Sequence, residues 1–182
     1  MDELIKEKWF KQLKKGDIFE VDGTQYRIAS DLVSSGNLKL YYVDVITNHM
    51  SQPTSSAIRM GKNQGLIIRN KVKLEARGYT PDEVMAIMAH ELGHLFSDNQ
   101  KDKDGTDDRT VEDELDSDKF AVEKCGIDPE VLESALRKDY NFKMKQLEDK
   151  KKSVPIEKVN AYKSEMEKRI LNAKRMHQEI QR

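Results

Sequence analysis

Several features that would assign the chain to a broad class of protein are scarce in its 182 residues. Cys125 is the only cysteine, so no intramolecular disulfide can form, which fits a reducing compartment. The 32 basic and 33 acidic side chains leave a formal net charge of -1, which gives no general attraction to nucleic acid or membranes. The composition therefore argues against a nucleic-acid-binding protein and against a disulfide-stabilised secreted one.

Long apolar runs are missing as well. No stretch approaches the roughly 18 to 20 apolar residues that a membrane-spanning helix needs. The N-terminal MDELIKEKWFKQLKKG contains no uninterrupted apolar segment of the kind found in signal peptides. Charged residues make up 36% of the chain, and the mean hydropathy is -0.80. We therefore expect a cytoplasmic protein with no integral membrane segment.

What is present is an ordered change of pattern along the chain. Residues 1–15 have the four-residue apolar spacing of a short amphipathic helix. Residues 17–70 contain four or five short strand-like segments, mostly antiparallel, between turn-forming residues. Asp22-Gly23, between the first two segments, is a strong hairpin-turn signal. From Thr80 onward the pattern is helical, so the whole chain predicts an α+β fold with a small, mostly antiparallel sheet.

Capping signals mark the first two long helices. Residues 80–83, TPDE, form a capping box with proline at the first helical position, and this helix should run to about Phe96. A polar loop, residues 97–109, follows. Thr110 then caps a second helix, which should end near Gly126. These two helices carry the residues that indicate a function.

Two further helices are expected at the C-terminal end. One begins after Asp128 and the other after Pro155, and together they read as a helical hairpin with a narrow apolar seam. We therefore predict two domains, a metallopeptidase-like domain of residues 1–127 and a helical C-terminal extension of residues 128–182. The seam also makes self-association through the C-terminal helices conceivable.

The first capped helix contains the motif HELGH, His90 to His94. Residues four apart lie on one face of an α-helix, about one 5.4 Å turn apart, so both imidazoles can reach one zinc ion. Glu91 lies at the flank of that face, where a carboxylate can take a proton from a metal-activated water. Gly93 leaves room beside the second histidine. The motif therefore predicts a catalytic site with one Zn2+ per chain.

The alternative is a helix whose two histidines bind no metal. His90 and His94 interrupt an otherwise apolar helical face. Two imidazoles facing a core without a metal would need other polar partners, because buried polar groups are costly when unpaired. A metal ion is the simpler interpretation.

A catalytic zinc ion needs a third protein ligand and an open fourth position. The spacing excludes the metzincins, because Ser97 and Gln100 stand where that class has glycine and histidine. The only other histidines are His49 and His177. A carboxylate is therefore expected, and the segment EDELDSDKFAVEKCG, residues 112–126, is the richest source.

Within this segment, Glu114 and Asp118 are again four residues apart on one helical face. Glu114 could bind the metal. Asp118, one turn further on, could accept a hydrogen bond from the free ring N–H of a ligand histidine, which we expect to be His90. Such partners fix the orientation of the ligand ring.

This combination resembles a known family. HELGH followed after nineteen intervening residues (95–113) by Glu114, in the form Glu-x-x-x-Asp, is similar to the gluzincin zinc metallopeptidases, including the thermolysin type. Over roughly residues 41–126 the chain more closely resembles the HtpX-like peptidases, although these are membrane-embedded and have alanine in place of Ser117. The short loop between the metal helices is closer to the ImmA/IrrE group, which usually has asparagine in place of Asp118. The chain looks most like a compact, soluble gluzincin.

The resemblance implies His90, His94 and Glu114 as metal ligands, Glu91 as general base and Asp118 as the supporting carboxylate. It implies a zinc metalloendopeptidase that cuts a peptide or protein substrate. In that chemistry zinc polarises the scissile carbonyl, and the base passes the proton of water to the leaving amine. The residue that steadies the oxyanion is left open, and the candidates by residue type are Arg169, Arg175, Tyr140 and Tyr162.

The resemblance also implies that the strand before the active-site helix borders the substrate cleft. An open backbone edge of this strand could pair with an extended peptide, as in β-augmentation. The residues concerned are Gly65, Leu66, Ile67 and Ile68. A buried core strand is the alternative interpretation of this segment.

Two other functions fit the same residues. One is an ImmA/IrrE-like regulatory protease with a single dedicated protein substrate. The other is a zinc-stabilised interaction module without turnover, in which the C-terminal hairpin is the working part. A Glu91→Gln substitution separates catalysis from metal binding and so distinguishes this last function from a protease.

Overall fold

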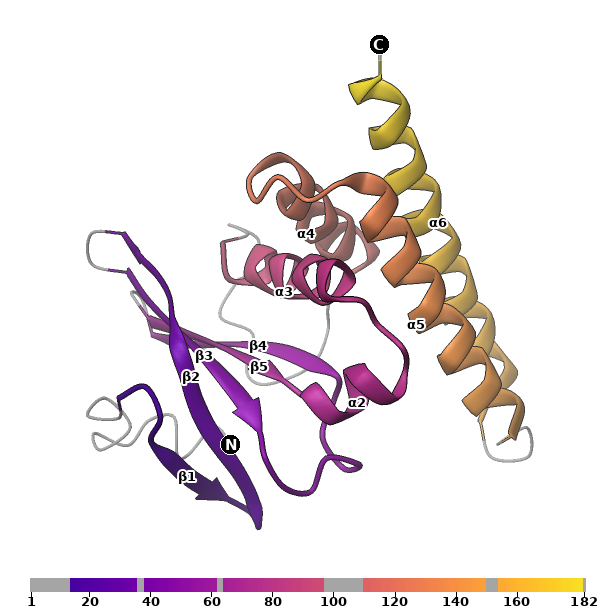
Figure 1. Cartoon of the computed structure of the whole chain (residues 1–182). Helices are drawn as coiled ribbons and strands as arrows, with labels where there is room; N and C mark the ends of the chain where they lie inside the picture. The colour runs from indigo at the N-terminus through magenta and orange to yellow at the C-terminus, as the bar shows by residue number, and fades with distance from the viewer. Residues whose placement is uncertain (1–13, 36–37, 62–63, 97–109, 150–153, 182) are drawn as a thin grey trace. The chain divides into compact units, whose positions relative to one another are not determined.

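The computed structural model describes residues 14–35, 38–61, 64–96, 110–149 and 154–181. It divides the chain into two compact units, Met1–Ala76 and Arg77–Arg182, which run from indigo to magenta and from magenta to yellow in Figure 1. The helix expected in residues 1–15 falls almost entirely outside the described residues, and the polar loop 97–109 lies wholly outside them.

A five-stranded sheet, in the order β1-β2-β3-β5-β4, forms the first unit (Figure 1). Its strands are β1 (Ile18–Val21), β2 (Thr24–Ser35), β3 (Leu38–Val45), β4 (Ser55–Gly61) and β5 (Gln64–Arg69). Only β3 and β5 are parallel among the neighbouring strands described, and the other pairs are antiparallel. The prediction of an α+β fold with a small, mostly antiparallel sheet is confirmed.

The Asp22-Gly23 turn joins β1 and β2 as predicted. Val21 pairs directly with Thr24, so the loop has two residues. Both loop residues have positive φ, 49° at Asp22 and 71° at Gly23. This is the backbone that a type I′ turn requires, and its twist matches that of the two strands it connects.

One face of the sheet carries an apolar core. Alternate residues of a strand point to the same face, and the buried side chains follow this period of two. The cluster comprises Val21, Tyr26, Ile28, Tyr41, Val43, Val45, Leu66 and Ile68. The sheet unit therefore has an apolar core on one face of its sheet.

The position of β5 corrects one prediction about substrate binding. β5 pairs with β3 on one side and with β4 on the other. Both backbone edges of Gly65, Leu66, Ile67 and Ile68 are therefore hydrogen-bonded within the sheet. The prediction that these residues offer an open edge to an extended peptide is wrong, because β4 folds back as a hairpin partner and forms the edge of the sheet.

Helix α2 (Lys71–Ala76) completes the first unit and was not expected from the sequence. It has six residues and one buried side chain, Leu74. A helix this short shows no repeat of apolar residues from which it could be recognised.

The second unit contains the four long helices that the sequence predicted. They are α3 (Pro81–Phe96), α4 (Val111–Glu123), α5 (Pro129–Asp149) and α6 (Ile156–Ile180). None of the described helices is long and apolar enough to span a membrane.

The capping box at the start of α3 is present and has an additional function. The Thr80 backbone N–H donates to Glu83 Oε2 at 2.7 Å, and the Glu83 N–H donates to Thr80 Oγ1 at 3.3 Å. Glu83 also accepts hydrogen bonds from Ser134 Oγ and Lys138 Nζ of α5, both at 2.6 Å. One carboxylate therefore caps α3 and ties it to α5.

Helices α5 and α6 lie side by side as a hairpin (Figure 1), and they share a core with α3 and α4. Its buried members come from all four helices: Ala86, Val122, Leu132, Leu136, Met166 and Ala173. The structural division falls after Ala76, whereas the sequence analysis placed a domain boundary after residue 127. The C-terminal hairpin therefore belongs to the same compact unit as the two helices that carry the candidate metal ligands.

Candidate metal centre

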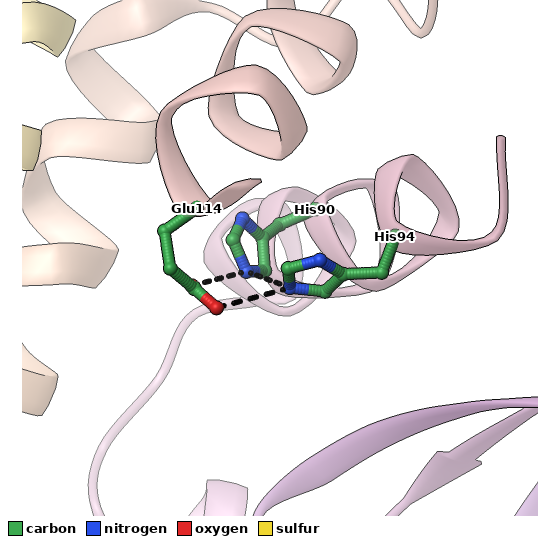
Figure 2. A group of neighbouring side chains, drawn as sticks. All are labelled: His90, His94 and Glu114. Carbon is green, nitrogen blue, oxygen red and sulfur yellow. Dashed lines mark hydrogen bonds and ion pairs between the residues drawn. The ribbon is translucent and has the colours of Figure 1, made fainter. Parts of the chain in front are cut away.

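Helices α3 and α4 bring the three expected ligands together (Figure 2). His90 and His94 project from one face of α3, and their Nε2 atoms are 3.0 Å apart. Glu114 of α4 faces them, with Oε2 3.2 Å from His90 Nε2 and Oε1 3.4 Å from His94 Nε2. Two residues of α3 and one of α4, with nineteen residues between His94 and Glu114 in the chain, thus converge on one point.

Gly93 allows this close approach of the two helices. A Cβ atom at this position would lie 2.8 Å from Ser117 Cα and 2.9 Å from the Ser117 carbonyl oxygen. Both of these are backbone atoms of α4, which cannot move aside as the end of a side chain can. The space expected beside the second histidine is therefore filled by the backbone of α4.

The distances fit a small metal ion. Ligands at 2.0–2.1 Å from a tetrahedral zinc ion are about 3.3 Å apart from one another. The two Nε2 atoms are 3.0 Å apart, and they lie 3.2 and 3.4 Å from the two different oxygens of Glu114, so each separation is near this value. Two imidazole nitrogens and one carboxylate oxygen are also a donor set that zinc prefers.

Helix α4 supplies a partner to the other nitrogen of each ring. His90 Nδ1 lies 2.8 Å from Asp118 Oδ1, and His94 Nδ1 lies 2.8 Å from Ser117 Oγ. An ionised carboxylate can only accept, so His90 donates from Nδ1, and in the neutral form of the ring its Nε2 keeps a lone pair. The hydrogen bond from His90 to Asp118 that the sequence predicted is therefore present.

The tautomer of His94 decides what the cluster can hold. If its Nδ1 donates to Ser117, the two Nε2 atoms and the Glu114 carboxylate face one another as acceptors, which requires a proton or a metal ion between them. If Ser117 donates instead, the His94 Nε2–H can donate to His90 Nε2, and no ion is needed. The serine hydroxyl is compatible with both arrangements, so the residues fit a metal ion that replaces one proton.

The electrostatics favour positive charge at this position. Burial and the neighbouring Arg169 lower the pKa of His90, but the carboxylates of Asp118 and Glu114 outweigh them and raise it to about 9. Burial raises the pKa of Glu114, but the positive charges of His90 and Arg169 bring it down to about 2. The same balance brings the pKa of Asp118 to about 2. The ring therefore carries a proton at neutral pH that a divalent ion would have to displace.

Arg169 of α6 reaches into the centre from the C-terminal hairpin. It donates from Nε to Asp118 Oδ2 and from Nη2 to Asp118 Oδ1, both at 2.8 Å, and its Nη1 lies 2.8 Å from Glu114 Oε2. The sequence had named it only as one of several candidate oxyanion donors. Its donors are directed at the carboxylates of α4, which is a different arrangement from an arginine left open to substrate.

The other three candidates for oxyanion stabilisation have contacts away from the ligand cluster. Tyr140 and Tyr162 stack on one another, and the Tyr162 hydroxyl donates to Asp139 Oδ2 at 3.2 Å. Arg175 is exposed on α6. In these contacts the two tyrosines bind residues of α5 and α6, and Arg175 lies on the surface, so geometry favours none of the three for this role.

The expected base, Glu91, follows His90 on α3 and is buried, with 6% of its surface exposed. A buried carboxylate next to a ligand histidine is in keeping with a general base that works in a partly water-excluded site. The role of Glu91 as general base stays a prediction from the motif.

Ser117 is the residue that the sequence analysis missed. It was noted only as a departure from the alanine of the HtpX-like peptidases. Its place three residues after Glu114 and directly before Asp118 puts it on the helical face that carries both carboxylates. That spacing was the available signal that its hydroxyl faces the histidines.

A second group of potential ligands lies on the surface of the same unit. Ligand atoms of Asp128, Glu130 and His177 lie within 4.8 Å of one another. Asp128 accepts a hydrogen bond from the Glu130 backbone N–H at 2.9 Å, which is an ordinary capping contact at the start of α5. Exposed acidic groups at a helix start are common without an ion, and we assign this group no function.

No family model, curated protein or solved structure matches the chain. The gluzincin resemblance therefore stays a resemblance of the motifs around His90 and Glu114.

Proposed function

We propose that the chain is a zinc-dependent metallopeptidase of the gluzincin kind. The observation that supports this most is the convergence of His90 Nε2, His94 Nε2 and the Glu114 carboxylate at mutual distances of 3.0–3.4 Å. Each of these groups is buried or nearly so, and each histidine has its second nitrogen hydrogen-bonded to α4. Three protein ligands also leave one coordination position for water or substrate, as catalytic zinc sites do.

In this proposal His90, His94 and Glu114 hold the ion, which when bound supplies Lewis acidity to a carbonyl group and to water. Glu91 accepts a proton from the attacking water as the new C–O bond forms. It then delivers that proton to the nitrogen of the leaving amine as the C–N bond breaks. Asp118 and Ser117 keep the histidine rings in the orientation that directs Nε2 toward the ion.

The test is metal analysis of the purified chain combined with digestion of a peptide library. We expect about one zinc per chain and cleavage that a chelator stops and added zinc restores. Glu91→Gln should keep its zinc and lose cleavage, because the amide occupies the same space but cannot take up the proton. Glu123→Gln is the matched control, since Glu123 is an exposed carboxylate near the end of α4.

The outcomes separate the candidate functions. A wild-type chain that binds zinc tightly but cleaves no peptide would favour the non-catalytic interaction module. Cleavage of one partner protein but of no library peptide would favour a regulatory protease with a dedicated substrate. A chain that binds no divalent ion, or a Glu91→Gln variant that cuts as well as the wild type, would overturn the proposal.

A further inference from the structure

Arg169 connects the C-terminal hairpin to the metal centre. It lies on α6, more than fifty residues after Asp118, and its exposed fraction is 8%. Its Nε and Nη2 bind both oxygens of Asp118, and its Nη1 binds one oxygen of Glu114. Nη2 also lies 3.2 Å from His90 Nδ1. A single guanidinium therefore contacts the supporting carboxylate, a ligand carboxylate and a ligand ring.

This arrangement depends on the shape of the guanidinium group. Its donors lie in one plane at fixed angles, so it can bind one carboxylate with two parallel bonds and a second carboxylate with a third. Lysine carries the same charge on a compact ammonium group and cannot reproduce this geometry. Glu114 and Asp118 are one helical turn apart, and Arg169 fixes the orientation of one relative to the other.

The positive charge and the geometry of Arg169 act on a metal ion in opposite directions. The charge repels a divalent cation nearby and would weaken its binding. The hydrogen bonds hold Glu114 and, through Asp118, the ring of His90 in the orientation in which their donor atoms converge, and this would strengthen binding. The two contributions can be separated by substitutions that keep or remove the charge.

We infer that Arg169 is a positioning residue of the metal centre, and that the C-terminal hairpin is thereby an integral part of this centre. Arg169 holds Glu114 and Asp118 so that the ligand atoms of His90 and Glu114 meet. The inference rests on the metal-binding part of the proposed function and is independent of peptide cleavage. It assigns to α5 and α6 a role in metal binding in addition to the core that they form with α3 and α4.

The experiment compares Arg169→Lys and Arg169→Met with Arg175→Lys and Arg175→Met in the full chain. Arg175 is an exposed arginine on the same helix, six residues further on, so its variants control for the change of residue type. Zinc affinity is measured by competition with a chelating dye at one pH. The absorption spectrum of the cobalt-loaded protein reports the ligand geometry, and thermal unfolding in chelator verifies that each variant folds.

We expect Arg169→Lys to bind zinc 10- to 100-fold more weakly than the wild type, although the charge is retained. Its cobalt spectrum should change, and Arg169→Met should bind at least as weakly. Both Arg175 variants should bind like the wild type. Should Arg169→Met fail to fold, the decision rests on Arg169→Lys alone.

An Arg169→Lys variant that loses less than tenfold in affinity and keeps the wild-type cobalt spectrum overturns the inference. So does an Arg169→Met variant that binds zinc more tightly than the wild type, because Arg169 would then act only as a counter-charge to the carboxylates. A wild-type chain that binds zinc but cuts no peptide would remove the peptidase proposal and leave this inference standing. A wild-type chain that binds no divalent ion would remove both.

Discussion

Both units of the chain contain a bidentate arginine–aspartate pair, but the two pairs are buried to different degrees. In the sheet, Arg69 of β5 donates to Asp44 of β3 at 2.7 and 3.0 Å, and the side chains are 23% and 13% exposed. In the helical unit, Arg169 donates to Asp118 at 2.8 Å twice, and the side chains are 10% and 0% exposed. The first pair keeps contact with solvent, and the second exchanges almost all of its hydration for protein contacts.

The buried polar groups as a whole follow the same division between the two units. Among the described residues of the sheet unit they are Thr24 and Asn70, which carry no charge. In the helical unit they are Glu83, His90, Glu91, His94, Ser117, Asp118 and Arg169. Burying ionisable groups costs free energy unless each finds partners, so a cluster of this size is hard to explain as a means of stabilising four helices. The contrast supports placing the proposed chemistry in the helical unit.

The largest effect should come from breaking the buried pair. Asp118→Ala leaves the Arg169 guanidinium buried with one carboxylate fewer, and loss of one partner of a buried ion pair typically costs about 3–5 kcal/mol. Asp44→Ala removes the matching carboxylate from the less buried pair and should cost less, about 1 kcal/mol. The loss in Asp118→Ala is measured by urea unfolding of the metal-free protein, monitored by the helical circular dichroism signal. Equal losses in the two variants would contradict the contrast between the units.

The second effect is a pH dependence of zinc binding. Because the pKa of His90 is raised to about 9, the ring is protonated below that pH, and zinc has to displace the proton. We expect zinc affinity to rise with pH between 6 and 9, by up to about tenfold per pH unit for one displaced proton. Dye competition at a series of pH values measures this. An affinity that is flat over this range would contradict protonation of the ligand ring.

The metal-free protein should show the opposite trend in stability over the same range. A raised pKa of His90 stabilises the fold below the ordinary value of 6.5, and that contribution is lost as the pH rises through about 9. The lowered pKa values of Glu114 and Asp118 stabilise it above their ordinary values of 4.5 and 3.8, and this is lost as the pH falls toward 2. In chelator, the helical unit should therefore be most stable between the two transitions, near pH 5 to 6, whereas the stabilisation by added zinc should grow toward alkaline pH.

The sequence predicted those features that depend on local spacing. The His90–His94 pair, the Asp118 contact and the Asp22-Gly23 turn all follow from periods of 3.6 or 2 and from turn chemistry. The sheet order did not follow from the sequence, because whether β5 pairs on one side or on both depends on where β4 lies after it folds back. For this reason the prediction of an open edge at residues 65–68 was wrong.

The role of Arg169 was beyond the sequence for a related physical reason. The sequence shows that α6 is amphipathic, but not which of its charged residues turns inward over Asp118. That choice depends on how α6 packs against α4, through contacts between residues about fifty positions apart. A buried arginine that makes a long-range contact leaves no pattern in the local sequence. Ser117 and Asp118, by contrast, can be related to Glu114 by their spacing along one helix.

A smaller effect should follow from separating the two metal helices. Gly93→Ala places a methyl group 2.8 Å from Ser117 Cα, so α3 and α4 must move apart, and overpacking of this kind costs about 1–3 kcal/mol. Zinc affinity should fall as well, because Glu114 moves away from the histidines. Gly23→Ala is the counterpart in the sheet, where positive φ makes alanine unfavourable by about 1 kcal/mol. A Gly93→Ala variant that keeps its zinc affinity would show that the backbones can adjust without moving the ligands.

The smallest effect should come from Ser117→Ala, which removes one hydroxyl and leaves the helix packing intact. The lost hydrogen bond to His94 Nδ1 should cost about 1 kcal/mol in the metal-free protein. Zinc affinity should fall about tenfold, because the ring of His94 can then rotate and Nδ1 has lost its acceptor. Both quantities are measured as for the larger substitutions, by urea unfolding in chelator and by dye competition.

Thr47→Ala is the matching substitution in the sheet unit, where Thr47 Oγ1 accepts a hydrogen bond from the Gln25 backbone N–H at 2.7 Å. It removes one hydroxyl partner, as Ser117→Ala does, and should cost a similar free energy of unfolding while leaving zinc affinity unchanged. The pair therefore separates loss of stability from loss of ligand orientation. If both variants bind zinc like the wild type, Ser117 does not orient His94, and the second ring must be held in place by its packing alone.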